Sequence, residues 1–307
     1  MHSPFLLSRL AGVPALNRAW RKAKATWKRS FQWPLHAVRK SRLHKYGLTS
    51  RSPLPVARLH LRDGCACRSL AVFVRPSWDA VRPLARMRAG APVAQALTQT
   101  AAVIDLNAFP DFMAWRKQVS KLTQGKYHRS ANKARRLGYV SRFIGAKSYE
   151  RSLYELTGSK PRRSKGILVW ASLIAPRPDL VDTRKPMVWP SCPRHWRLTW
   201  GAFHVDESGG ERLAAFAKLM RSGDLVRVES FIGHGAALTD GVTKMLMFDI
   251  MEWLLERDHP CAEGVRYFIH GSIEEGGIGL FDWKRYLGFV PMLLDVADAL
   301  QQLRLFD

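Results

Sequence analysis

The stretch that decides the fold is Gly279-Leu280-Phe281-Asp282-Trp283-Lys284-Arg285-Tyr286-Leu287-Gly288-Phe289-Val290-Pro291. It predicts a short helix that ends at Leu287, because Gly288 is the residue type that closes a helix in a left-handed conformation. An apolar run over residues 289–294 follows the glycine and predicts a buried strand. The C-terminal part of the chain therefore alternates helix and strand, as in a mixed α/β fold.

Upstream of this stretch, hydrophobic periodicity and turn residues predict a longer series of elements. In chain order they are a basic helix at 126–137, a strand at 139–144, a helix that starts at Ser148, three strands at 197–205, 212–218 and 225–232, a helix at 239–257 and a strand at 265–270. Short turns rich in Gly and Ser join the three central strands, so these form an antiparallel meander.

This order resembles the GNAT acyltransferase superfamily. The aromatic-Lys pair Trp283-Lys284 before Leu287-Gly288-Phe289 is similar to the closing signature of its FemAB-like branch. The resemblance implies a GNAT-like α/β (α+β mixed) fold, with a central mixed, mostly antiparallel sheet flanked by helices. It also implies an N-acyltransferase that moves an acyl group from an acyl-CoA donor to an amine. The rival within enzymes is a FemAB-like transferase that uses aminoacyl-tRNA.

The resemblance places a general base on the third meander strand, where Glu229 lies. A base is needed because only a neutral amine attacks a carbonyl carbon. The competing interpretation is a solvated carboxylate that is offset by Arg227 on the same strand face. His204, His234 and His270 are alternative bases at strand ends.

Lys284 lies near the position of the general acid in many GNAT enzymes. A cation there would stabilise the oxyanion of a tetrahedral intermediate. The competing interpretation is an ordinary lysine on the surface of a helix, and Tyr286 is a second candidate proton donor.

A glycine-rich loop precedes the helix predicted at 239–257. Its glycines would let backbone N–H groups approach the phosphates of a donor at the helix N-terminus. The candidate cofactor-binding residues are Gly233, His234, Gly235 and Gly241. The competing interpretation is a plain turn in which Asp240 takes the anion position as a helix cap.

Charge divides the chain into two halves. Residues 1–165 carry 34 Lys and Arg against 6 Asp and Glu, a net charge of +28, whereas residues 166–307 carry 15 against 19, a net charge of −4. Such a basic half favours a polyanionic partner, either tRNA or an anionic membrane surface. We therefore expect a basic N-terminal region at 1–99, with an amphipathic helix at 15–33 and a strand at 70–74, and a catalytic domain at 100–307. One interpretation of the N-terminal region is a degenerate partner module. A third hypothesis is a non-catalytic protein that binds nucleic acid or anionic membranes.

Four cysteines are too few for a disulfide scaffold in 307 residues, which favours a cytoplasmic protein. No run approaches the roughly 20 apolar residues that span a bilayer, so any membrane contact would be peripheral, at the inner face. Cys65-Ala66-Cys67 and Cys192-Pro193-Arg194-His195 carry four zinc-ligand types between them. Their spacing is not that of a zinc finger and they lie far apart in sequence, so we expect no metal.

Overall fold

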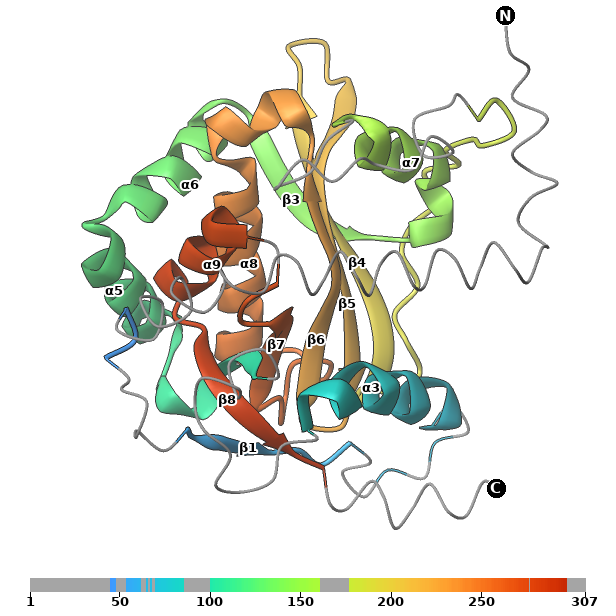
Figure 1. Cartoon of the computed structure of the whole chain (residues 1–307). Coiled ribbons are helices and arrows are strands. Elements are labelled where there is room, and N and C mark those ends of the chain that lie inside the picture. The colour runs from blue at the N-terminus through green and yellow to red at the C-terminus, as the bar shows by residue number, and fades with distance from the viewer. Residues whose placement is uncertain are drawn as a thin grey trace, which may run out of the picture. The chain divides into compact units, whose positions relative to one another are not determined.

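The computed structural model describes residues 45–47, 54–61, 65, 67, 70–85, 100–160, 177–275 and 277–296 (Figure 1). The chain divides into two compact units, Met1–Ser52 with Pro92–Ala94 and Pro53–Ala91 with Gln95–Asp307. Almost all described residues belong to the second unit, which is the one characterised below. The amphipathic helix predicted near the N-terminus lies outside the described residues.

The described strands of this unit form one eight-stranded sheet in the order β1-β8-β2-β7-β6-β5-β4-β3. The strands are β1 (Val56–Arg58), β2 (Ala101–Asp105), β3 (Tyr139–Ile144), β4 (His195–Val205), β5 (Glu211–Ser222), β6 (Leu225–Gly233), β7 (Tyr267–Ser272) and β8 (Val290–Asp295). Two neighbouring pairs, β1 with β8 and β6 with β7, are parallel, and the others are antiparallel. The expected mixed, mostly antiparallel sheet is confirmed.

Helices cover both faces of the sheet (Figure 1). They are α3 (Leu70–Ala85), α5 (Phe112–Thr123), α6 (Lys126–Arg136), α7 (Glu150–Gly158), α8 (Val242–Glu256) and α9 (Gly277–Tyr286). Helices α5, α6 and α8 pack together on one face, with α9 against α5, and α3 and α7 lie on the other. None of these helices has both the length and the apolar character needed to cross a membrane.

The predicted order of elements from Tyr139 onward is confirmed. The helix ends are set as the sequence indicates: α6 stops at Arg136, and Gly138 adopts a left-handed φ of 80° before β3 begins. One local detail differs, because Tyr149 and not Ser148 stands at the start of α7, without a side-chain cap.

The region before residue 100 contributes more to this unit than the sequence suggested. The run from Leu70 to Val74, expected to be a strand, is the start of α3. Val74, Trp78 and Val81 recur at helical spacing and bury their side chains in a core shared with β1, β2, β7 and β8. The division at residues 99 and 100 stays a prediction, although β1 and α3 belong to the same compact unit as the sheet.

Candidate active site at the fork between two parallel strands

Strands β6 and β7 separate along their length. They pair in parallel only from Leu225 opposite Tyr267 to Arg227 opposite Ile269. Beyond these residues β6 continues to Gly233 and β7 to Ser272, with no ladder between them among the described strands. We call the opening that follows Arg227 and Ile269 the fork.

A bulge in each strand accounts for the separation. In β6, Ser230 and Val228 pair with adjacent residues of β5, so Glu229 has no partner on that strand. In β7, His270 and Gly271 lie opposite a single residue of β2, and Gly271 has a left-handed φ of 59°. Bulges bend a strand and re-aim its side chains, so β6 and β7 turn apart here.

The facing edges of the fork have no strand partner in the described part of the sheet. Beyond the fork, β6 is still paired with β5 on its other side, and β7 with β2. On these two strands, the edges that face each other carry backbone N–H and C=O groups that pair with no described strand. Such groups need partners from side chains, water or a ligand. An extended ligand with amide groups can pair with a strand edge of this kind.

Aromatic rings from three elements meet at the fork. Phe231 of β6 lies 5.4 Å from Trp283 of α9, and Trp283 lies 5.5 Å from His270 of β7, measured between ring centroids. Phe231 and His270 are 6.4 Å apart. All three rings are half-buried. They line the fork with aromatic surface.

Lys284 is buried beside these rings. Its side chain has 0% exposure, and Nζ donates a hydrogen bond of 2.6 Å to the carbonyl oxygen of Ser272, the last residue of β7. Burial lowers the pKa of Lys284 to about 8, and Glu275 opposes this shift. Lys284 is therefore not the surface lysine of the competing interpretation. Its role in catalysis stays a prediction.

His270 is neutral in this environment. Burial, together with the positive charge of Lys284, lowers its pKa to about 3. At neutral pH the imidazole therefore carries one N–H donor and one lone pair. The sequence named His270 only as one of three histidines at strand ends. The glycine after it, inside an apolar run, was the signal that a bulge and a re-aimed side chain follow.

Glu229 lies within a cluster of ion pairs. Its carboxylate oxygens are 2.6 Å from Arg227 Nη2 and 3.2 Å from Arg197 Nε. This is the arrangement that the competing interpretation anticipated, with a second arginine added. The bulge at Glu229 still places the residue where β6 leaves β7, and its role as a base stays a prediction.

Tyr286 packs against α6 and not against the rings at the fork. Its ring meets Tyr127 of α6 edge-on at 5.7 Å, and the guanidinium of Arg285 lies 4.4 Å from its centroid. The structure brings Lys284 and His270 together, whereas Tyr286 joins α9 to α6. Its role as a proton donor stays a prediction.

The glycine-rich loop forms a 3-10 helix, η7 (Gly235–Asp240), followed by α8. His234 caps η7, because its Nδ1 accepts a hydrogen bond of 3.3 Å from Ala236 N. Gly241 stands at the start of α8 with φ of 89° and no side-chain cap, and a Cβ atom there would lie 2.2 Å from Ser130 O. Asp240 bonds instead to Tyr139 and Lys133. Asp240 thus leaves the N-terminus of α8 uncapped.

The remaining glycines of the loop differ in how closely they are packed. A Cβ atom at Gly233 would lie 2.7 Å from both Leu238 and Thr243, whereas one at Gly235 would meet only ordinary contacts. Gly233 and Gly241 therefore have packing reasons to be glycine. Binding of a donor by Gly233, His234, Gly235 and Gly241 stays a prediction.

A basic pocket lies on the surface of α6. It has a volume of about 470 Å³ and is lined by Arg129, Asn132, Arg135 and Arg136. Arg135 forms an ion pair with Asp249 of α8, and Arg129 bonds to the carbonyl oxygen of Gln124. The helix itself contains no acidic residue. The pocket is suited to an anion such as phosphate.

No protein-family model and no curated protein matches the chain. Among solved structures, it is similar to the C-terminal DUF2156 domain of a putative lysylphosphatidylglycerol synthetase from Agrobacterium fabrum, with 17% identity, a TM-score of 0.37, and coverage of 67% of this chain and 62% of that one. It is also similar to L-PGS from Bacillus licheniformis, with 14% identity, a TM-score of 0.39, and coverage of 62% and 57%. A tandem GNAT protein from the clavulanic acid biosynthesis pathway shows 16% identity, a TM-score of 0.37, and coverage of 78% and 73%.

The chain thus spans less than two thirds of the length of the first two structures. At these identities and TM-scores the likenesses carry no argument about activity, which has to come from the site itself. The FemAB-like assignment stays a prediction.

Proposed function

We propose that the protein is an N-acyltransferase that binds an acyl-CoA donor in the fork between β6 and β7 and transfers the acyl group to an amine. The observation that carries this proposal is the fork itself: two parallel strands that part beside a buried cation. The resemblance of the sequence to GNAT acyltransferases agrees with it.

The donor would lie along β6. The arm of coenzyme A is extended and contains amide groups, so it can pair with the open strand edge beyond Arg227. Its phosphates would face the N-terminus of α8, where Gly241 provides no side-chain cap. Backbone N–H groups and the helix dipole favour an anion at that position.

In the reaction, the amine nitrogen would form a bond to the thioester carbonyl carbon, and the carbon–sulfur bond would break. Lys284 donates one hydrogen bond to Ser272, which leaves two N–H groups of its ammonium for the oxyanion or the departing sulfur. The amine loses its proton to a base, for which Glu229 is the first candidate and the neutral His270 the second. The proton taken up by the base would then pass to the thiolate, directly or through water, and the thiol would leave as free coenzyme A.

Aminoacyl-tRNA is the second candidate donor. The basic pocket on α6 favours it, because three arginines around one pocket suit a phosphate backbone. The net charge of +28 over residues 1–165 supports the same partner and would also allow contact with an anionic membrane at its cytoplasmic face.

Equilibrium unfolding with each donor tests the proposal. A ligand that binds only the folded chain at about 100 times its Kd raises the free energy of unfolding by roughly 2.7 kcal/mol. We expect acetyl-CoA or a longer acyl-CoA to produce such a shift. A shift with aminoacyl-tRNA and none with millimolar acyl-CoA would replace the first candidate by the second. Binding of any tRNA, charged or uncharged, without transfer to amines would favour the non-catalytic hypothesis.

A pair of variants separates the two donors further. Arg129→Ala with Arg136→Ala should weaken tRNA binding and flatten its salt dependence, since each lost phosphate contact removes roughly 0.7 to 0.9 from the log-log slope. Arg177→Ala is the control, because Arg177 is an exposed arginine outside the pocket that pairs with Asp179. Equal effects of the pocket and control variants would mean that the pocket does not bind the phosphate backbone.

A further inference from the structure

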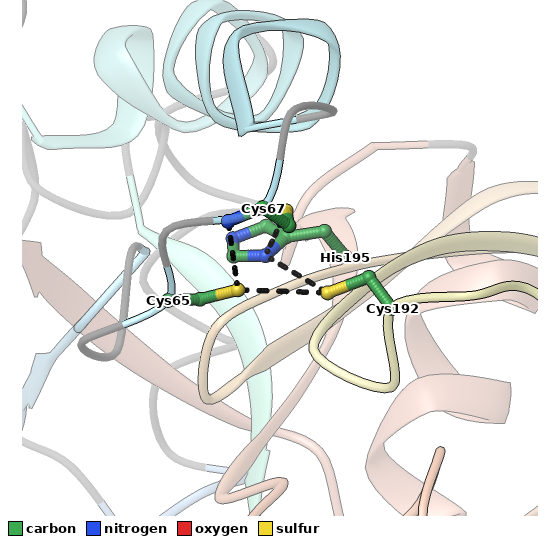
Figure 2. Close-up of side chains that lie close together, drawn as sticks. All are labelled: Cys65, Cys67, Cys192 and His195. Atoms are coloured by element: carbon green, nitrogen blue, oxygen red, sulfur yellow. Dashed lines mark hydrogen bonds between the residues drawn. The ribbon is translucent and has the colours of Figure 1, made fainter.

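Four potential metal ligands from distant parts of the sequence converge on one point: Cys65, Cys67, Cys192 and His195 (Figure 2). We call them the Cys3His cluster. Two belong to the segment between β1 and α3, and two to the start of β4 and the residues just before it. Their ligand atoms all lie within 4.8 Å of one another. The fold therefore brings these four residues together, despite the separation in sequence that argued against a metal.

The spacing inside the cluster fits a tetrahedral ion. In a tetrahedral site, zinc–sulfur bonds of about 2.3 Å and zinc–nitrogen bonds of about 2.0 Å place two sulfurs about 3.8 Å apart and a sulfur and a nitrogen about 3.5 Å apart. Cys65 Sγ lies 3.6 Å from Cys192 Sγ, and His195 Nδ1 lies 3.6 Å from Cys192 Sγ. Cys67 Sγ lies 3.5 Å from the same Nδ1. The sulfur–sulfur distance is far longer than the roughly 2 Å of a disulfide.

The imidazole of His195 is oriented for coordination. Its Nε2 lies 2.9 Å from the carbonyl oxygen of Leu61. A carbonyl can only accept, so Nε2 carries the proton and Nδ1 presents its lone pair to the sulfurs of Cys67 and Cys192. Ligating histidines commonly donate their other N–H to a backbone carbonyl in this way. Leu61 O is held in place by a second donor, Ser222 Oγ, at 3.0 Å.

We propose that the Cys3His cluster binds one zinc ion as a structural site. Three thiolates and one imidazole in a tetrahedron form a donor set that zinc prefers, and four protein ligands leave no position for a catalytic water. His195 and Cys192 are buried, and the ring of Phe73 on α3 packs 6.3 Å from His195. The ion would fasten the segment that leads into α3 to the first residue of β4.

The zinc ion would add to contacts that already hold this segment against the sheet. The residues before the cluster run close against the turn between β5 and β6: His60 N donates to Asp224 Oδ1 at 2.9 Å, and Asp224 N donates to His60 O at 3.3 Å. Helix α3 then lies against β4, β5 and β8. A metal between these contacts would link the two segments by coordination.

The experiment measures metal in the purified, untagged full chain. We expect about one zinc per chain by inductively coupled plasma mass spectrometry after extensive dialysis. Cys67→Ser and Cys192→Ser should each lower the zinc content to background. Cys261→Ser is the matched control, because Cys261 is also buried but lies outside the cluster, and it should retain the metal. Equal zinc content in all of these proteins would overturn the proposal.

A second measurement does not depend on how the variants fold. Wild-type protein is stripped of metal with a chelator under reducing conditions and then titrated with cobalt(II). We expect the intense visible bands of tetrahedral cobalt and a sulfur-to-cobalt charge-transfer band, together with a higher melting temperature. A folded wild-type chain that gives neither band would contradict the proposal. So would a disulfide between Cys65 and Cys192 found by mass spectrometry in protein purified under reducing conditions.

Discussion

Burial of the Lys284 ammonium lowers the free energy of unfolding, and its hydrogen bond to Ser272 does not fully offset this loss. An ammonium group with no exposed surface loses most of its hydration, and this loss is the main cause of its lowered pKa. Groups that destabilise a fold and are nonetheless present are often part of a functional site. The proposed acyl transfer therefore depends more on Lys284 than on any other residue.

The destabilisation caused by burying Lys284 can be measured as a pH dependence of the free energy of unfolding. Its pKa falls from 10.5 in the unfolded chain to about 8 in the folded one, so between these values the unfolded chain binds one more proton. Wild-type stability should therefore rise with pH across this window, relative to Lys284→Met, by about 3 kcal/mol. Urea unfolding of both proteins from neutral pH to about pH 10.5 measures the difference. Lys147→Met, at an exposed lysine, is the control and should show no such trend. A flat difference for Lys284→Met would mean that its ammonium is solvated.

Turnover tests the role of the same charge. If Lys284 stabilises a charge that exists only in the transition state, Lys284→Met should lower kcat by roughly 10² to 10³ with little change in KM. Because only the ammonium form acts, the wild-type rate should also fall as pH rises through about 8. Steady-state kinetics with an acyl-CoA and a panel of amines measures both. A variant with unchanged turnover would leave Lys284 as an anchor between α9 and β7.

At the scale of elements, the contact between the segment before the Cys3His cluster and the turn after β5 is unusually close. Gly223 has φ of 61°, and a Cβ atom there would lie 1.8 Å from His60 O. Gly223→Ala should therefore lower the free energy of unfolding by about 2 kcal/mol or more, through clash as well as backbone strain. Gly209→Ala is the matched control, because Gly209 has φ of 79° and no atom lies within 4 Å of an added Cβ. Only the strain of a left-handed backbone, about 1 kcal/mol, should then lower the free energy of unfolding. Equal losses in chemical denaturation would show that residues 54–61 do not dock on this turn.

The sequence predicted the elements from Tyr139 onward because each is long, periodic and bounded by glycine or turn residues. It did not predict β1 and β2, which have three and five residues and no alternation to mark them. It mistook the start of α3 for a strand because a short apolar run fits either structure.

The sequence predicted only part of the candidate site. Lys284 and Glu229 were named because of a family resemblance, not because of spacing. The fork depends on where β6 and β7 stop pairing, and that point is set by bulges at Glu229 and Gly271. The Cys3His cluster depends on contacts between residues more than 120 positions apart, as Cys65 and Cys192 are. Spacing along the chain carries no information about such contacts.

At the scale of the whole molecule, the second compact unit combines two features on one sheet. The fork opens where β6 and β7 part, whereas the Cys3His cluster lies at the start of β4. The fork is the place proposed for chemistry, and the cluster is the place proposed for stabilising the attachment of α3. Loss of zinc should therefore affect stability first and donor binding only through unfolding.

Hydrogen–deuterium exchange with and without an acyl-CoA tests the central proposal most directly, because it locates the donor on the chain. We expect peptides that contain residues 228–233 of β6 and 270–272 of β7 to exchange more slowly in the presence of the donor, as their open edges gain hydrogen-bond partners. Peptides from β4 and α3 should not change. Unchanged exchange throughout, or slowing confined to α6, would contradict an acyl donor in the fork.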